Sequence, residues 1–312
     1  METRRTHRKL YDDLAVKLKL WEDHYGDMPG ITDHDYRKTF IEQIISSLRR
    51  IEYITQIQNR SIDPERSNPH SPLFDPLRSA ILMAKKVDTD EAIWTVFIAT
   101  HFGRHIADGW KLAANVYGSF GEGPTWSSDT YRADKKGFEA MLQKNLAKLQ
   151  DKHISGRYSN HRQYQSKNPI SIATTFRTFS EWQFSEETFA QKIRGIHKKR
   201  GQNPEEVFDE LYHGIKSVFG FGRLGAFDFL TMIGKMQVAP ISPGSVYLTG
   251  ATGPLRGAKL LFNGDPVGKC NVRDLEKKVD LMDNFLMVGK QVIEDSLCNW
   301  QKSPSKYVYF GG

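Results

Sequence analysis

The stretch LYHGIKSVFGFGRLGAFDFLTMIGKM, residues 211–236, decides the predicted fold. Apolar residues recur at helical spacing on both sides of Gly220-Phe221-Gly222, which predicts two helices joined by a tight turn. Ala226 supplies a small residue where the helices would cross closely. We interpret this G-x-G-x-x-x-A pattern as a helix-hairpin-helix element. An ordinary glycine turn is the alternative, and a Rossmann turn is disfavoured because no strand precedes the glycines.

Such a hairpin predicts a phosphate-binding surface. Backbone N–H groups at the start of its second helix point outward, and the helix dipole favours an anion there. Lys216 and Arg223 would add charge-assisted contacts that position a duplex without reading its sequence. The basic run Lys198-Lys199-Arg200 either extends this contact along DNA or is a solvated helix face. The predicted DNA-binding residues are therefore Lys216, Gly220, Gly222, Arg223, Arg162, Lys198, Lys199 and Arg200.

Periodicity outside the hairpin predicts a mainly α fold. Apolar residues at helical spacing predict helices in the first 50 residues. The segments LRSAILMAKK and EAIWTVFIATHFGRHIADGWKLAANVYG predict two core helices, and Asp88 to Asp90 supply the turn and the N-cap between them. Further helices are predicted at 134–151, 171–199, 204–218, 223–236 and 272–297. Long ordered loops are predicted at 58–76, 118–129, 152–170 and 240–257, where Pro, Gly or polar residues replace the helical period.

Composition narrows the class of partner. The net charge of +7 and the pI of about 9.2 suit a polyanionic partner, of which nucleic acid is the commonest. A merely soluble basic protein is the alternative, and charge alone does not separate the two. Two cysteines, Cys270 and Cys298, make a disulfide framework or a cysteine zinc site unexpected, and a reducing cytoplasm fits. No apolar run is long enough for a membrane span. We expect a helical segment at 1–57 and one helical domain at 58–312.

Several strings from about residue 50 onward resemble one protein family. They are DPERSNP and SPLFDPL (63–77), DEAIWTVFIATHFGRH (90–105), NHRQYQS (160–166), FGFGRLGAFDFLTMIGK (219–235), YLTGATGPLRGAKLLF (247–262) and EDSLCNWQKSP (294–304). The chain resembles the α-glutamyl/putrescinyl thymine pyrophosphorylases of clade 3. The resemblance implies an architecture like that of helix-hairpin-helix DNA glycosylases and an association with hypermodified phage DNA. It also implies two reactions, amine attachment to activated hydroxymethyluracil or excision of glucosylated hydroxymethylcytosine.

Either reaction requires a base flipped out of the duplex. Base release passes through an oxocarbenium-like sugar. A carboxylate either stabilises this positive charge or activates the water that attacks the sugar. Helix-hairpin-helix glycosylases usually carry this acid about one helix beyond the hairpin, but residues 229–264 contain no Asp or Glu. Asp228 is the first candidate, with a raised pKa unless it is paired to Arg223 or a backbone N–H. Asp75 is the second, and N-capping of the helix near Pro76 is its alternative role.

Polar and aromatic residues cluster in three further places that could line a base or sugar pocket. His101 and His105, spaced i, i+4, would share a helix face; we favour pocket contacts or a core role over metal, since no third ligand is evident. Stacking and donor groups gather in the loop residues Asn160, His161, Arg162, Tyr164 and Gln165, and again at Asn299, Trp300, Gln301 and Lys302. Tyr247 is a separate candidate: with Gly250 to Gly257 it could form a backbone nest for phosphate or sugar hydroxyls, and a structural loop is the alternative. Lys302 or Lys235 could serve as a Schiff-base amine if desolvated. No metal or other cofactor is expected.

Three functions fit these patterns. The first is a DNA glycosylase that excises a hypermodified pyrimidine, leaving an abasic site, as a defence against bacteriophage. The second is a transferase that displaces pyrophosphate from activated hydroxymethyluracil in DNA, which requires a site for an amine or amino acid. The third is a non-catalytic DNA-binding module. We favour the glycosylase, with double-stranded DNA carrying modified bases as the partner.

Overall fold

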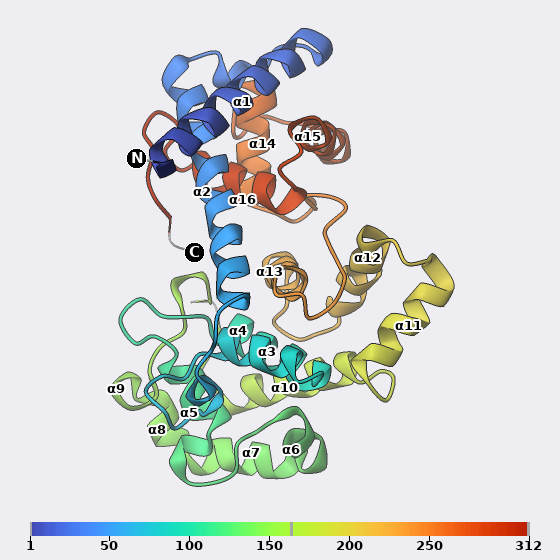
Figure 1. Cartoon of the computed structure of the whole chain (residues 1–312). Coiled ribbons are helices and arrows are strands. Elements are labelled where there is room, and N and C mark those ends of the chain that lie inside the picture. The colour runs from blue at the N-terminus through green and yellow to red at the C-terminus, as the bar shows by residue number, and fades with distance from the viewer. Residues whose placement is uncertain (1, 163–164, 311–312) are drawn as a thin grey trace. The chain divides into compact units, whose positions relative to one another are not determined.

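The computed structural model describes residues 2–162 and 165–310 (Figure 1), and the side chains from residue 8 onward within those ranges. These residues form sixteen α-helices and four short 3-10 helices and contain no β-strand, which confirms the mainly α prediction. The chain divides into two compact units. Unit 1 comprises Met1–Ile54 and Pro243–Gly312, and unit 2 comprises Thr55–Ser242.

Unit 1 combines helices from both ends of the chain. Its elements are α1 (Glu2–Tyr25), η1 (Pro29–Ile31), most of α2 (His34–Gln58), α14 (Gly253–Asn263), α15 (Val272–Leu286) and α16 (Lys290–Trp300). Leu18 and Phe40 from the N-terminal helices pack in one core with Leu261 and Trp300 from the C-terminal ones. Helices α14 and α16 meet at Gly257, where a Cβ would overlap the Leu297 carbonyl oxygen. Glycine therefore sets how closely these two helices approach.

Unit 2 is built from the middle of the chain. Its elements are η2 (Pro64–Ser67), α3 (Pro76–Lys85), α4 (Thr89–Phe102), α5 (Lys111–Tyr117), η3 (Ser119–Gly121), α6 (Ser128–Ala133), α7 (Lys135–Lys144), α8 (Leu146–Gln150), α9 (Lys152–Ser155), η4 (Asn160–Arg162), α10 (Pro169–Gln183), α11 (Phe189–Arg200), α12 (Pro204–Ile215) and α13 (Arg223–Lys235). Helix α4 is the centre of this unit. It is apolar on all sides and almost every residue is buried, as expected of a helix surrounded by others.

Aromatic packing fixes α4 against its neighbours. Phe97 of α4 stacks on Phe179 of α10 with ring centroids 3.9 Å apart, and Phe221 of the hairpin turn lies 6.0 Å from Phe97. Asp88 caps α4 by accepting from the Glu91 backbone N–H at 3.1 Å, which confirms the predicted cap. The hairpin turn is thus anchored in the core of unit 2 by its central aromatic residue.

Four predicted helices are broken in the structure. The segment 91–118 divides into α4 and α5 because the chain turns at Gly103 and Gly109, both at positive φ. The other divisions are 134–151 at Asn145, 171–199 at the Thr188 capping box and 272–297 at Gly289. Conversely, the predicted loop 240–257 contains the start of α14, where Pro254 occupies the first turn and its missing N–H costs nothing.

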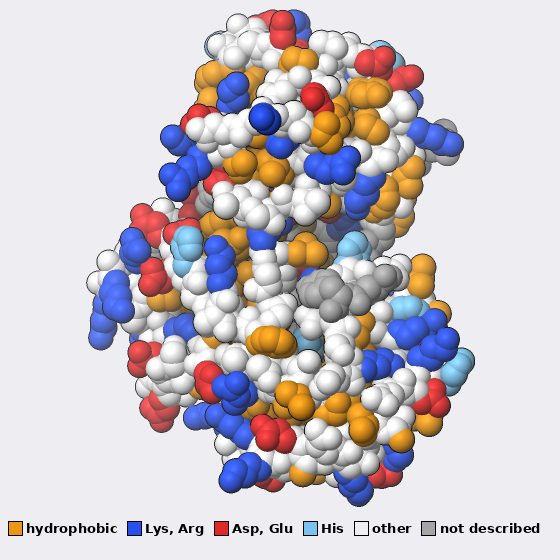
Figure 2. Space-filling model, turned by 180° about the vertical axis from the view of Figure 1, so that it is seen from behind, with side chains coloured by type: hydrophobic (Ala, Val, Ile, Leu, Met, Phe, Trp, Pro, Cys, Tyr) orange, Lys and Arg blue, Asp and Glu red, His pale blue; other side chains and the backbone are white. Residues whose placement is uncertain are grey.

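The surface is basic without being uniformly so. On the face in Figure 2, lysine and arginine side chains are dispersed, with acidic side chains between them. None of the helices in the described part of the chain has the length and apolar composition needed to cross a bilayer.

Candidate functional site

Helices α12 and α13 flank the glycine turn as predicted. Gly220 adopts a φ of 76°, and Gly222 is the N-cap of α13, where it offers no side chain to the first N–H groups of the helix. The cations beside the turn lie over aromatic rings, Lys216 over Tyr212 at 4.4 Å and Arg223 over Phe227 at 4.6 Å. The turn therefore presents a helix N-terminus with positive charge on both sides, an arrangement that attracts anions.

The polar loop before α10 contacts this hairpin at two points. Arg162 Nη2 donates to Asp228 Oδ2 at 2.8 Å, and Gln165 Nε2 donates to the Gly220 carbonyl at 3.2 Å. The loop and the hairpin are more than fifty residues apart in sequence. The structure therefore brings together two groups of residues that the sequence singled out separately. Tyr164, the stacking residue predicted in this loop, lies outside the described residues.

Arg162 is held from several sides. Its side chain is 7% exposed, and its Nε donates to the Thr100 carbonyl at 2.8 Å in the last turn of α4. The Ser159 backbone N–H donates to the Phe102 carbonyl at 3.1 Å, which fastens the same loop to the end of that helix. Gly103 makes the close packing possible, because a Cβ there would overlap the Ser159 side chain. Arg162 is thus a buried cation with a fixed orientation.

Asp228 is the more accessible member of the pair. Its side chain is 42% exposed, and it lies in the second turn of α13, six residues after the N-cap Gly222. The predicted alternative partner was Arg223 or a backbone N–H, whereas the structure pairs the carboxylate with Arg162. A carboxylate held by a buried guanidinium and open on its other side can bind a solvent molecule or a polar ligand.

The two predicted histidines do not share a helix face, which corrects the sequence interpretation. Helix α4 ends at Phe102, so His101 lies in the helix and His105 in the following turn. His101 is buried among the rings of Phe97, Phe102 and Tyr158, and neither of its ring nitrogens has a hydrogen-bond partner among the described residues. Burial, with a smaller effect of the Arg162 charge, lowers the pKa of His101 to about 3. His101 is therefore a neutral core residue.

His105 organises the turn between α4 and α5. Its Nδ1 accepts from the backbone N–H groups of Ala107 at 3.2 Å and Asp108 at 3.1 Å, which assigns the proton to Nε2. This nitrogen also lies 3.5 Å from Asp108 Oδ2, but an unprotonated Nδ1 makes no ion pair. His105 is buried, so it shapes the turn instead of facing solvent.

Asp75 serves as a helix cap. Its carboxylate accepts from the backbone N–H groups of Leu77 and Arg78, both at 3.1 Å, and from the Arg78 guanidinium at 2.6 Å. Pro76 follows at the first helical position. These contacts confirm the N-cap expected at this position and occupy the carboxylate in stabilising α3.

The other predicted residues of unit 2 lie on its surface. Asn160 and His161 are exposed in η4, beside Arg162. The run Lys198-Lys199-Arg200 forms the exposed last turn of α11, where positive charge also complements the helix dipole, and Arg200 pairs with Glu210 at 3.2 Å.

Four predicted site residues belong to unit 1. Trp300 is fully buried and donates from Nε1 to the Tyr36 carbonyl at 3.1 Å, so its ring is part of the core. Gln301 donates to the Cys298 carbonyl, and Lys302 donates to Asn299 Oδ1 at 3.0 Å. Tyr247 is half-buried with a φ of 48°, a conformation that non-glycine residues rarely adopt.

A cavity of about 450 Å³ lies between α10, α11 and α12, and no sequence pattern indicated it. Lys192 and Trp182 line it, and the Lys192 ammonium donates to the Trp182 carbonyl and lies over its ring at 4.0 Å. The Trp182 indole N–H is buried and has no hydrogen-bond partner in the part of the chain that the structure describes. Burial lowers the pKa of Lys192 to about 8. No sequence pattern indicates that Lys192 lies beside Trp182, because the two residues belong to different helices, α11 and α10.

Taken together, the fold is an all-helical one in the described residues, and the site is a hairpin N-terminus coupled to a half-exposed carboxylate. These features are those of a helical protein that presents a helix N-terminus and two cations beside a carboxylate. The chain belongs to the α-glutamyl/putrescinyl thymine pyrophosphorylase family, clade 3, whose model matches residues 35–312. This confirms the family suggested by the sequence strings. No curated protein and no solved structure matches the chain.

Proposed function

We propose that this protein is a DNA glycosylase that flips out and excises a hypermodified pyrimidine, most simply a glucosylated hydroxymethyl base of phage DNA. The observation that carries the proposal is the ion pair by which Arg162 of η4 holds Asp228 on the second helix of the hairpin. In this proposal the α12–α13 hairpin binds the phosphates of double-stranded DNA, with Lys216 and Arg223 contacting the same strand. A carboxylate six residues after the phosphate-binding turn lies where an extruded nucleotide enters.

The chemistry asked of Asp228 is limited. The bond between the sugar C1′ and the base nitrogen breaks, and its electron pair leaves with the base. The developing oxocarbenium charge is stabilised by the carboxylate, and a water adds to C1′ as Asp228 accepts its proton. Arg162 holds the carboxylate in one orientation throughout. The proton taken up by Asp228 passes through solvent to the departing base anion, so the products are the free base and an abasic site.

The family description supports a second candidate, a pyrophosphorylase-type transferase. In that reaction an amine displaces pyrophosphate from an activated hydroxymethyluracil, and the base stays attached to the sugar. The carboxylate at Asp228 would then accept the proton released by the attacking amine. The two candidates differ in one product, since only the glycosylase leaves an abasic site.

The experiment that tests the proposal is base release from DNA. Duplexes carrying cytosine, hydroxymethylcytosine, glucosylated hydroxymethylcytosine or hydroxymethyluracil are incubated with the protein and treated with alkali, which cleaves at abasic sites. We expect breaks in one modified duplex, reduced about 100-fold or more in Asp228→Asn. Asp209→Asn, an exposed acid of α12 that lies 3.4 Å from His213, is the matched control and is expected to behave as the parent.

The remaining outcomes separate the candidates. Breaks that persist in Asp228→Asn keep the glycosylase and move the acid elsewhere. An absence of breaks in every duplex contradicts the glycosylase for these bases. The transferase is then tested with pyrophosphorylated hydroxymethyluracil DNA and an added amine, by release of pyrophosphate.

A further inference from the structure

The turn between α4 and α5 holds an apolar side chain out in water. Ile106 is 87% exposed at the tip of residues 103–110. A single exposed apolar residue is ordinary on a protein surface. The backbone beneath this one, however, is unusually well fixed, and it is fastened to the candidate site.

Three sets of contacts make the turn rigid. His105 and Gly109 form an isolated antiparallel bridge, with N–H to carbonyl distances of 3.0 and 2.8 Å. Inside the turn, His105 Nδ1 accepts the two backbone N–H groups described above. Outside it, the Arg157 guanidinium binds both oxygens of Asp108, at 2.7 and 2.9 Å. Hydrogen bonding to Arg157 lowers the pKa of Asp108 to about 2, so this clamp persists across ordinary pH.

The turn and the candidate carboxylate share one anchor. Arg157 and Arg162 belong to the same loop; the first holds the turn, and the second holds Asp228. Gly103, where the turn begins, lies directly against the Arg162 side chain. Three residues of extended chain span at most about 11 Å, so Ile106 lies within that distance of Gly103. The apolar tip therefore has a fixed position relative to the Arg162–Asp228 pair.

The charge beside the tip favours nucleic acid. Arg104 is exposed, and among the described residues it makes no ion pair, in contrast to Arg157. A cation without an acidic partner, two residues before an exposed apolar side chain, matches a phosphate beside a base step. The one acid in the turn, Asp108, is already bound by Arg157.

We infer that the turn is a wedge: Ile106 enters the base stack at the gap left by the extruded nucleotide, and Arg104 contacts a flanking phosphate. This inference rests on the proposed function, because it assumes that the protein opens duplex DNA. It adds the residue that keeps the opened state from closing, since an apolar side chain in the gap replaces the lost stacking.

The test uses duplexes that need no excision. One carries a tetrahydrofuran abasic site beside 2-aminopurine, and the other is the intact duplex with 2-aminopurine at the same place. The parent protein is expected to bind the abasic duplex about tenfold more tightly than the intact one, because the missing base avoids the cost of unstacking. Binding is also expected to change the 2-aminopurine fluorescence. Ile106→Ala is expected to lose both the preference and the fluorescence change, and Ile106→Leu to retain them.

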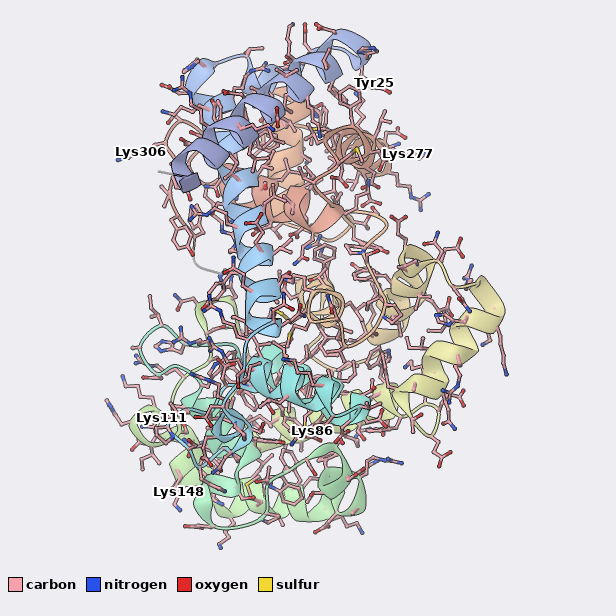
Figure 3. The ribbon with its side chains drawn as sticks, viewed as in Figure 1. Tyr25, Lys86, Lys111, Lys148, Lys277 and Lys306 are labelled. Atoms are coloured by element: carbon pink, nitrogen blue, oxygen red, sulfur yellow. The ribbon has the colours of Figure 1, made fainter. Side chains whose placement is uncertain are left out.

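Val87→Ala is the matched control. Val87 is 85% exposed in unit 2 and directly follows Lys86. Figure 3 shows Lys86 well apart from Lys111, the first residue after the turn. This variant should bind as the parent does. Arg104→Ala should weaken binding to both duplexes alike and reduce the slope of log K against log salt by about 0.9, as the loss of one phosphate contact predicts.

Each outcome decides the inference. A preference for the abasic duplex that survives in Ile106→Ala overturns the wedge and leaves the glycosylase proposal standing. A parent protein without any such preference also overturns it. If Ile106→Ala loses the preference while no modified duplex yields abasic sites, the wedge is supported and the glycosylase proposal fails.

Discussion

Arg162 joins the end of α4 to the hairpin, with its Nε on the Thr100 carbonyl and its Nη2 on the Asp228 carboxylate, each at 2.8 Å. One side chain thereby connects the core helix of unit 2 to the acid proposed for catalysis. The contact should therefore matter for the stability of unit 2 as well as for function.

We expect Arg162→Ala to lower the free energy of unfolding by about 2 kcal/mol. The value is below that for a fully buried pair because Asp228 is partly exposed and water can solvate it. A double-mutant cycle with Asp228→Ala, measured by urea denaturation, should give a coupling energy of about 1 kcal/mol. A coupling energy near zero would mean that Arg162 stabilises the fold through contacts other than the one with Asp228, such as its hydrogen bond to the Thr100 carbonyl.

Glu91 predicts a loss of stability as the pH rises. Burial raises the pKa of its carboxyl to about 7, although Tyr117 and the Ser128 backbone N–H both donate to it at 2.6 Å. The folded state therefore holds a proton that the unfolded state releases near pH 4.5. The free energy of unfolding should fall between about pH 4.5 and pH 7, by on the order of 3 kcal/mol from this group.

Glu91→Gln isolates this effect. Its amide oxygen can accept from Ser128 while its NH₂ group donates to the Tyr117 hydroxyl oxygen, so the contacts are kept without the charge. Urea denaturation at a series of pH values should show the variant gaining stability over the parent as the pH rises to 8. A constant difference at all pH values would contradict the prediction.

His101 has the opposite pH dependence. Its folded pKa of about 3 means that the unfolded state binds a proton which the core excludes. The stability contributed by neutral His101 should be complete above about pH 6.5 and fall as the pH decreases toward 3, by up to about 5 kcal/mol. Acid denaturation monitored by circular dichroism should shift to lower pH in His101→Phe, because a phenyl ring takes up no proton and fits among the rings of Phe102 and Tyr158.

A shift in the other direction would mean that His101 gains a partner in solution. The free energy of unfolding of His101→Phe at pH 7 provides a second measurement. Because neither ring nitrogen has a hydrogen-bond partner within the described ranges, removal of both should cost little there.

Lys192 should be the most reactive amine of its helix near pH 8. Burial lowers its pKa to about 8, so about half of the side chain is neutral and nucleophilic at that pH. Trace acetylation across a pH series, read by peptide mass spectrometry, should give a midpoint near 8 for Lys192. The exposed Lys198 on the same helix provides the comparison, and equal reactivity of the two lysines would refute the prediction.

Gly257→Ala should destabilise unit 1. The new Cβ would meet the Leu297 carbonyl of α16, a backbone atom that moves only with its helix. We expect a loss of roughly 3 kcal/mol in the free energy of unfolding. Gly195→Ala is the matched control, because no atom lies within 4 Å of its added Cβ in α11, and it should stabilise by about 0.5 to 1 kcal/mol.

The sequence predicted those features that depend on neighbouring residues. The caps at Asp75 and Asp88 were predictable because an Asx residue two or three positions before a helical N–H is a local arrangement. The hairpin helices were predictable from apolar spacing. The break at Gly103 was harder, since the helical period continues through it, and only the packing of Ser159 against that glycine shows why the helix ends there.

The candidate site required long-range information. Arg162 and Asp228 are 66 positions apart, and no local pattern indicates that they pair. The same holds for His101, whose polar side chain suggested a pocket but which the surrounding aromatic residues enclose. The sequence therefore identified the residues of the loop and of the hairpin, and the structure supplied the contact between them.

Unit 1 is formed by the first and the last segments of the sequence, and unit 2 by the segment between them in sequence. During synthesis, α1 and the first part of α2 leave the ribosome long before α14, α15 and α16 exist to cover their apolar faces. Unit 2 has all of its own helices by then and can fold first. A chain that terminates early would carry a folded middle and a sticky, uncovered N-terminal helix pair, which chaperones and proteases recognise. Only a chain translated through α16 could cover these apolar faces and so avoid chaperones and proteases.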